Sequence, residues 1–417
     1  MKRSYQHTRR ACYIGYISQA AVNNLAPILF VVFQRQFGLS YEHISWLILL
    51  NFGTQLAVDM LSVRFLDRIG YRAAAILSHA LAAAGLLMLG LLPLLVSSPF
   101  WGLVPAVVLY ALGGGMIEVL VSPLVEALPG NRKAADMSLL HSFYCWGQVA
   151  VVLASTLLVR LIGEERWFLL PILWALVPLG NLLFFRKVPL PALNGEEAGP
   201  SLRQLFSSRF FLLALLLMTC AGAAEITMSQ WSSLFAERAL GIDKVMGDLL
   251  GPCLFALLMG IGRTVFGLWG NRLPLQKLLL GSALFCAACY AVTAFVPSPT
   301  LSLLGCAFCG LSVSLMWPGL YSYSAARFPA GGTTMFGMLA LFGDIGCSLG
   351  PWLAGMVSEL AQNGNLSAFA ATNGLTPEQA GLKAGMAAVL LFPLTMAAGL
   401  LVSLCRSRRR RCSEYSR

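Results

Sequence analysis

The chain has 417 residues, of which 58% are hydrophobic and only 11% are charged, and its mean hydropathy is +0.74. A soluble globular domain carries about 25% charged residues, so the composition excludes that class. The net charge of +11 could suggest nucleic-acid binding. The basic residues are instead spread over loops between apolar runs, and we expect no nucleic-acid partner.

Apolar runs recur along the whole chain, and each is close to the length of about 20 residues that a helix needs to cross a bilayer. Twelve such runs are found, at 11–33, 42–65, 73–96, 100–128, 134–160, 167–185, 209–236, 245–270, 276–296, 300–325, 332–360 and 380–404. We therefore predict an all-α polytopic membrane protein with twelve transmembrane helices. The segment Met1–Arg10 is basic and the first run is too long for a signal sequence, so no cleavable signal is expected.

The loops between these runs differ in charge. Of the 29 Lys and Arg residues, 22 fall on the side of the two termini, 6 fall on the other side, and Arg263 lies within a run. By the positive-inside rule, this asymmetry predicts that both termini are cytoplasmic. We expect a monomeric, multi-pass protein of the plasma or inner membrane, with its basic tail close to anionic lipid headgroups.

Hydrophobicity drops in one segment, between Phe185 and Phe206, which is rich in Pro, Gly and charge. It divides the chain into an N-terminal six-helix half (1–186), a cytoplasmic linker (187–206) and a C-terminal six-helix half with a basic tail (207–417). A short pattern recurs between the halves at an offset of 204 residues: Asp59, Val63, Asp67 and Arg68 match Arg263, Gly267, Asn271 and Arg272. Such a repeat is expected of an internally duplicated transporter.

The first two runs carry polar side chains at mid-depth. Asn23 and Asn24 lie near the middle of the first run. Asn51, Gln55 and Asp59 of the second run are spaced i, i+4, i+8, which places them on one helical face. Polar residues at such positions either line a cavity or form hydrogen bonds between helices, and both alternatives are open for these side chains.

The fourth and fifth runs contain the next polar positions. Glu118 lies deep in the fourth run, where a carboxylate is costly unless it faces water or a partner. Gly113–Gly115 lie one turn away and are expected to leave room for a ligand or water beside it. On the fifth run, His141, Tyr144 and Gln148 share a face by their spacing.

In the C-terminal half, Glu225 lies at mid-depth of the seventh run and is followed by Gln230 and Trp231. Tyr321 is in the tenth run. Asp344 is about 12 residues into the eleventh, or ~18 Å at 1.5 Å per residue, again near the middle of a bilayer.

Two further patterns are assigned to packing. Gly346 and Gly350 form a G-x-x-x-G motif, which permits close helix contact. A C-x2-C-x16-C-x2-C spacing fits a zinc template, with the ligands Cys286, Cys289, Cys306 and Cys309. These cysteines lie in apolar helices, where free Cys is an ordinary buried residue. We expect no metal and no cofactor.

The intramembrane acids indicate proton coupling. A carboxyl group in a medium of low dielectric holds its proton more tightly and can exchange it near neutral pH, as a proton-coupled carrier requires. We predict this role for Glu118, Glu225 and Asp344. The alternative is a structural acid paired with Arg263 or His141. Amide and aromatic side chains suit a polyhydroxyl ligand, and the expected substrate-binding residues are Asn23, Asn24, Gln55, His141, Gln148, Gln230, Trp231 and Tyr321.

The loop after the second run contains a more specific motif, "VRFLDRIGYR". It resembles the signature G-x-x-x-D-R-x-G-x-[RK] of the major facilitator superfamily, with Val63 in place of the leading Gly. The resemblance and the cytoplasmic position predict gating roles for Asp59, Asp67, Arg68, Gly70, Arg72 and Arg263.

Four segments, "GGGMIEVLVSPL", "LLHSFYCWGQ", "AEITMSQW" and "GDIGCSLGPW", are similar to the fucose/glucose–proton symporter branch of that superfamily. The resemblance implies that Glu118 matches the glutamate of span four implicated in proton coupling. It also implies that spans 1, 4, 7 and 10 line the cavity, while spans 2 and 11, and 5 and 8, form gates. The branch has a carboxylate on span one, where this chain has Asn23 and Asn24.

We therefore expect a secondary active transporter that moves a small polar solute, a sugar or related metabolite, by proton symport. The alternative is a proton-antiport exporter of drugs or metabolites. The four histidines are scattered and form no motif such as H-E-x-x-H, so we expect no catalytic residues and no enzyme activity.

Overall fold

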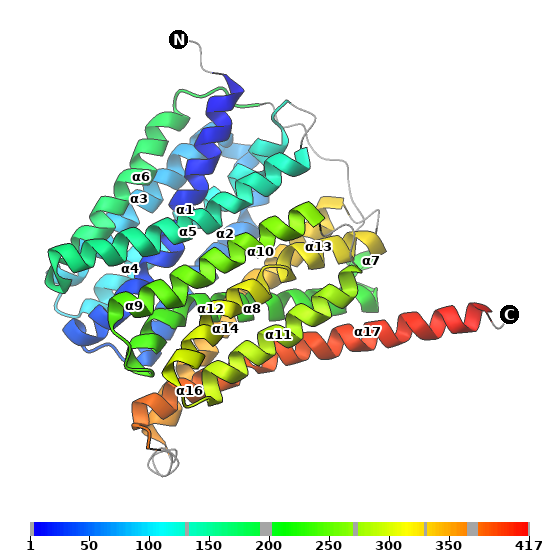
Figure 1. Cartoon of the computed structure of the whole chain (residues 1–417). Helices are drawn as coiled ribbons and strands as arrows, with labels where there is room; N and C mark the ends of the chain where they lie inside the picture. Colours follow the sequence, from blue (N-terminus) through cyan, green and yellow to red (C-terminus); the bar gives the residue numbers. More distant parts are fainter. Residues whose placement is uncertain are drawn as a thin grey trace.

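The structure is a computed structural model that describes residues 4–129, 133–191, 202–269, 274–328, 332–364 and 374–415. Every regular element in these ranges is helical (Figure 1). Eleven described stretches are long and apolar enough to cross a membrane, and α6, with 17 residues, is a shorter apolar helix. Together they occupy the positions of the twelve expected spans, which confirms the all-α polytopic fold.

The first six spans are formed by single helices. They are α1 (Tyr5–Phe37), α2 (Tyr41–Ile69), α3 (Tyr71–Leu95), α4 (Pro99–Glu126), α5 (Lys133–Ile162) and α6 (Leu169–Phe185), with the 3-10 turn η1 (Glu164–Arg166) before α6. The short helix α7 (Leu202–Phe206) lies within the segment expected to be a linker.

The remaining spans are formed by α8 (Arg209–Arg238), α9 (Lys244–Asp248), the π-helical turn η2 (Leu249–Cys253), α10 (Leu254–Trp269), α11 (Leu275–Phe295), α12 (Pro299–Val313), α13 (Met316–Arg327), α14 (Gly332–Asn363), α16 (Pro377–Val389) and α17 (Leu391–Tyr415).

Three of these later spans are interrupted, which the hydropathy pattern alone did not predict. The eighth contains η2, the tenth is divided into α12 and α13, and the twelfth is divided into α16 and α17. Pro252, Pro318 and Pro393 lie at or just after the three interruptions. Proline lacks the N–H that would bond to the carbonyl four residues earlier, so each helix reorganises locally at that point.

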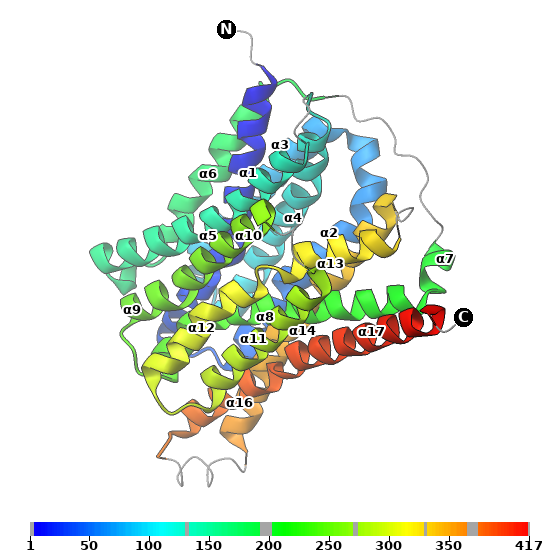
Figure 2. The same ribbon diagram turned by 45° about the vertical axis from the view of Figure 1, so that its right-hand side comes forward.

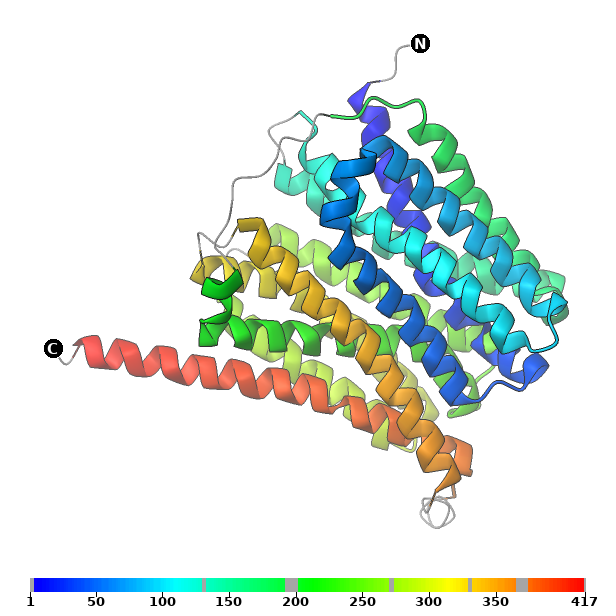
Figure 3. The ribbon, with the colours of Figure 1, turned by 180° about the vertical axis from the view of Figure 1, so that it is seen from behind.

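The helices of opposite halves pack in pairs. α5 runs beside α10 in Figures 1 and 2, and the blue α2 runs beside the orange α14 in Figure 3. α1 also contacts α8. These are the pairings expected for spans 5 with 8 and 2 with 11, so the polar faces of α1, α2, α5 and α8 are brought towards one another.

Local sequence signals explain where several helices begin. Ser40 accepts a hydrogen bond from the His43 backbone N–H at 3.2 Å, and Thr376 accepts one from Gln379 at 3.2 Å. The Gln379 side chain in turn accepts from the Thr376 backbone at 3.0 Å. Ser40 and Thr376 therefore act as N-caps of α2 and α16, and Thr376 and Gln379 form a capping box.

Candidate substrate and proton site

A layer of amide side chains joins α1 to α2 at the middle of the bundle. Gln19 donates to Gln55 at 2.8 Å, and Gln55 donates to the side-chain oxygen of Asn23 at 2.8 Å. Asn51 donates to the same oxygen at 3.2 Å. Gln230 on α8 donates to the Asn23 backbone carbonyl at 2.9 Å, so the layer reaches the C-terminal half. These five amides are buried and bond to one another, although Gln19 Oε1 has no hydrogen-bond partner among the described residues.

A second set of polar contacts crosses between the halves beside this layer. Gln148 on α5 donates to the Ser229 hydroxyl of α8 at 2.9 Å, and Ser229 donates to Asn24 of α1 at 3.5 Å. Asn23 and Asn24 both approach the Tyr144 hydroxyl, at 3.4 and 3.5 Å. The predicted amides therefore meet in one place, and they also hold helices together.

Glu118 faces an open space inside the bundle. Its carboxylate accepts a hydrogen bond from buried Gln19 at 2.9 Å, which places it among the helices and away from lipid. Glu118 is nevertheless an exposed residue, and so is His141 on α5. The His141 ring lies 5.4 Å from the ring of Tyr16 on α1. Exposure at these inward-facing positions indicates a solvent-accessible space between the helices.

The acids Asp59 and Asp344 lie together. Their side chains form a hydrogen bond between α2 and α14, and both lie within electrostatic reach of Glu118. Tyr321 on α13 is close to the same group. The sequence assigned Asp59 to gating and Asp344 to proton coupling, whereas the structure places the two in one cluster between the halves.

Glu225 and Arg263 form an ion pair between α8 and α10. Arg263 Nη2 lies 2.7 Å from Glu225 Oε1, and the side chains are 22% and 8% exposed. Arg263 Nη1 also donates to the Cys145 thiol of α5 at 3.5 Å. Of the two alternatives for Glu225, the structure thus contains the paired acid, and Arg263 is its partner.

The glycines beside Glu118 do not create the room that was expected. A Cβ atom on Gly113 would lie 2.3 Å from the Ala82 backbone nitrogen of α3, and one on Gly114 would lie 2.8 Å from Gln19 Oε1. These positions are filled by neighbouring helices, so that prediction is wrong. The glycines instead let α4 approach α1 and α3 closely enough for Glu118 to meet Gln19.

Two predicted aromatic residues have different surroundings. Trp231 is fully buried, and its indole N–H donates to the Pro351 carbonyl of α14 at 3.1 Å. This contact favours a packing role for Trp231. Tyr321 is half-buried, and its ring lies 6.4 Å from that of Trp317 and 5.5 Å from that of Phe336, near the acids.

The signature loop joins α2 to α3. Asp67 and Arg68 lie in the last turn of α2, and their side chains are outside the described part. Gly70 has a φ of 76°, which a residue with a Cβ rarely adopts. Arg72 donates to the carbonyls of Phe185, at 2.8 Å, and Val188, at 2.9 Å, and so ties the start of α3 to the end of α6.

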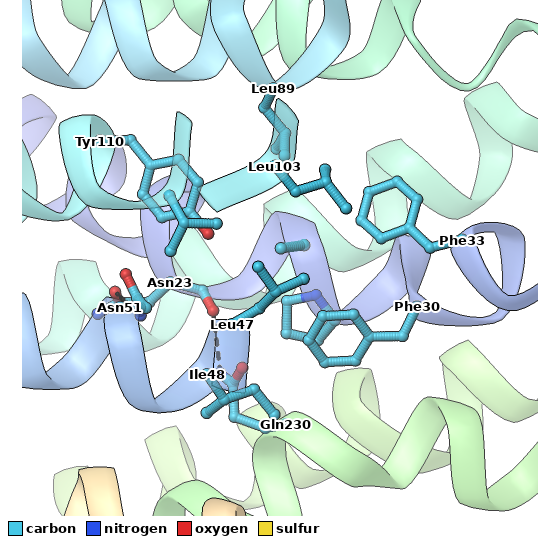
Figure 4. A pocket seen from close by; sticks show the side chains of 13 residues that line it. Asn23, Phe30, Phe33, Leu47, Ile48, Asn51, Leu89, Leu103, Tyr110 and Gln230 are labelled. Atoms are coloured by element: carbon cyan, nitrogen blue, oxygen red, sulfur yellow. Dashed lines mark hydrogen bonds between the residues drawn. The ribbon is translucent and has the colours of Figure 1, made fainter. Parts of the chain in front are cut away.

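A narrow pocket extends from the amide layer along α1 (Figure 4). Asn23, Asn51 and Gln230 line its polar end, and Phe30 and Phe33 line its apolar end. Since Phe33 is one turn from the end of α1, the pocket leads from the amides towards the side of the bundle opposite the termini.

That opposite side is closed by a buried polar cluster around Asp248. Its carboxylate accepts from Lys244 at 3.0 Å and from Thr156 of α5 at 3.0 Å, and also from Ser233 of α8. Asp248, Thr156 and Ser233 are all buried. The cluster therefore ties the N-terminal half to the C-terminal half.

Arg35 at the end of α1 forms a second connection nearby. It pairs with Glu164 of η1 at 2.9 Å and with Glu237 of α8. Sequence reasoning missed this connection, the Asp248 cluster and Gln19. The available signals were the i, i+4 spacing of Gln19 to Asn23 and the presence of Asp248 within an apolar run.

These features define a class of protein. Paired spanning helices, an interior that holds acids and amides, and polar closure at one end are the features of a membrane transporter. Residues 12–351 match the Major Facilitator Superfamily, and the chain belongs to this family. It is accordingly a transporter and not an enzyme.

Membrane protein MosC of Rhizobium meliloti is 25% identical over 271 residues, which are 63% of this chain and 63% of MosC. Among solved structures, a bacterial homolog of the human lysosomal transporter Spinster superposes with a TM-score of 0.74 at 16% identity, covering 96% of this chain and 97% of that one. The nucleoside transporter NupG gives 0.74 at 12% identity, covering 95% and 98%.

The E. coli fucose:proton symporter FucP gives a TM-score of 0.60 at 19% identity, covering 94% of this chain and 99% of that one. At these identities the three structural similarities establish a shared fold.

Proposed function

We propose that this protein moves a small polar solute, a sugar or related metabolite, together with a proton by alternating access. Glu118 carries the proposal, because it is an exposed carboxylate inside the bundle that bonds to the amide layer. Protonation of Glu118 would remove the charge that Gln19 now stabilises and would alter the connection between α1 and α4. The names of FucP and NupG, which refer to fucose with a proton and to nucleosides, are consistent with a polar solute.

The substrate-facing residues in this proposal are Asn23, Asn24, Gln55, His141, Gln148, Gln230 and Tyr321. Glu225 and Asp344 are further proton sites, and Asp59, Arg263 and the signature loop control opening. The halves 1–186 and 207–417 move about the linker, with both termini cytoplasmic. Impermeant labelling of single cysteines at positions 133 and 272 from outside the cell would contradict this orientation.

The Glu118→Gln variant tests the proton site, because glutamine imitates a protonated carboxyl of the same size. We expect it to bind substrate and exchange it across proteoliposomes but to fail to accumulate it when a pH gradient is imposed. Glu42→Gln, at an exposed position, is the matched control and should transport normally. Accumulation by a stable Glu118→Gln protein would exclude Glu118 as the coupling site.

A structural acid would behave differently. If Glu118 only held helices together, its replacement would lower the melting temperature and all transport modes in parallel. The antiport alternative is separated by the direction of flux. An inward proton gradient drives a symported solute into the vesicle, and the same gradient drives an antiported solute out.

A further inference from the structure

The Glu225–Arg263 pair is incompletely bonded. The pair makes one contact at 2.7 Å although a guanidinium and a carboxylate can form two parallel hydrogen bonds. Among the described residues, Glu225 Oε2 and Arg263 Nε are buried and have no hydrogen-bond partner. The remaining contact of Arg263, with the Cys145 thiol, is weak because thiol sulfur is a poor acceptor.

Within the described part of the chain, the surroundings supply no second counter-charge for Arg263. The titratable groups within electrostatic reach of the pair are His141, Tyr144 and Cys145 of α5 and Cys347 of α14, and Tyr290 of α11 donates to the Ala224 carbonyl beside Glu225. None of these is an anion in its usual form at neutral pH. Glu225 is thus the carboxylate that balances Arg263 within the described part of the chain.

A ligand can reach the pair. Arg263 is 22% exposed, and exposed His141 lies within its electrostatic reach. The pair also lies where α10 packs against α5 of the other half, and Arg263 itself contacts Cys145 of α5. A group bound to Arg263 would therefore contact both halves, as a transported substrate must.

We infer that Arg263 binds a carboxylate of the substrate and that Glu225 competes for the same guanidinium. This inference rests on the proposed transport function and narrows the substrate to an acidic solute, such as a sugar acid. A proton from solvent adds to a Glu225 oxygen, and the neutral acid no longer pairs with Arg263. The substrate carboxylate then takes two N–H bonds from Arg263. When the substrate leaves, Glu225 releases its proton and pairs again.

This exchange couples the two solutes by charge balance. The site holds one positive and one negative charge before and after binding, so neither state leaves a buried charge uncompensated. A neutral sugar would not balance Arg263 once Glu225 is protonated. One proton must therefore enter with each carboxylate.

The test compares matched neutral and acidic solutes in proteoliposomes at an imposed inward proton gradient. The probes are glucose with glucuronate and galactose with galacturonate. We expect uptake of the acidic member of a pair and none of the neutral member. Uptake of neutral members alone would overturn the inference and leave the proposed function intact. Absence of any flux in this assay would count against both.

Two variants examine the pair itself. Glu225→Gln keeps Arg263 permanently available, so equilibrium binding of the acid to the purified protein should lose the dependence on pH that it has in the native chain. Arg263→Gln together with Glu225→Gln removes both charges and leaves none unpaired. This double variant should remain folded, as measured by its melting temperature, and should bind the acid on the order of 10- to 100-fold more weakly than Glu225→Gln.

Retained pH dependence of binding in Glu225→Gln would assign the competing proton to another group, such as His141 or Glu118, and would overturn the inference. Equal affinity of the double and single variants for the acid would overturn it as well. Glu42→Gln again serves as the control.

Discussion

The Asp248 cluster allows a quantitative prediction about the closed side. Thr156 on α5 donates to Asp248 at 3.0 Å, and both residues are buried. Thr156→Val removes the hydroxyl and preserves the shape. A hydrogen bond to a charged group contributes about 1.5–3 kcal/mol, which at about 1.4 kcal/mol per factor of ten corresponds to roughly a 10- to 100-fold change in equilibrium. The bond joins the two halves, so this energy favours the closed arrangement.

Spin labels at Leu161 and Leu360 measure the effect, because both positions are exposed and belong to opposite halves. We expect Thr156→Val to shift the distance distribution between the labels towards longer separations. Thr156→Ser keeps the hydroxyl and should resemble the native protein. A distribution in Thr156→Val identical to that of the native chain would refute the reasoning.

The Arg35–Glu164 contact provides a comparison, because its interaction energy is expected to be smaller than that of the Thr156–Asp248 bond. The two side chains are 45% and 37% exposed, and ion pairs in such positions contribute about 0–1 kcal/mol. Glu164→Gln should therefore change the distances between the labels much less than Thr156→Val does. Arg35 and Glu164 both belong to the N-terminal half, so an equally large effect would show that the shift does not depend specifically on bonds between the halves.

Three further predictions concern packing and the loop. Gly346→Val should lower the melting temperature sharply, since a Cβ there would lie 2.0 Å from the Thr219 carbonyl oxygen; an unchanged melting temperature would contradict the contact. Arg72→Gln should cost about 1–3 kcal/mol in unfolding experiments, because carbonyls at the end of α6 lose their donor. Trp231→Phe should leave substrate affinity within about twofold while reducing stability by about 1 kcal/mol, the net contribution of one hydrogen bond, as shown by binding and thermal melts.

Much of the fold followed from the sequence because hydropathy acts locally. A run of apolar residues specifies a spanning helix wherever it packs, and the G-x-x-x-G of Gly346 and Gly350 forms the close contact with α8 that was predicted. The interruptions near Pro252, Pro318 and Pro393 were not predicted, since a proline within a spanning helix is tolerated in some surroundings and divides the helix in others.

Only part of the site was predicted, because spacing along a single helix is the local information that the sequence contains. Spacing on one helix indicated that Asn51 and Gln55 share a face, and the structure confirms this through their common partner Asn23. Partners on different helices depend on how each helix is rotated and how closely it packs, which no local pattern contains. The contact of Glu118 with Gln19 and the pairing of Asp59 with Asp344 therefore became visible only in three dimensions.

The hydrogen bonding within the amide layer has a kinetic consequence. Gln19, Gln55, Asn23 and Asn51 bond to one another, so the substrate-free protein keeps most of the polar groups of this layer paired, and Gln19 Oε1 is the group of these four side chains that lacks a partner among the described residues. A carrier whose empty site exposed unpaired groups would be held back from reorienting and would act as an obligatory exchanger. Here the amide side chains can bond to one another again after the solute leaves, and we expect the empty carrier to reorient readily across the membrane. Each cycle can then deliver net solute without requiring a counter-substrate.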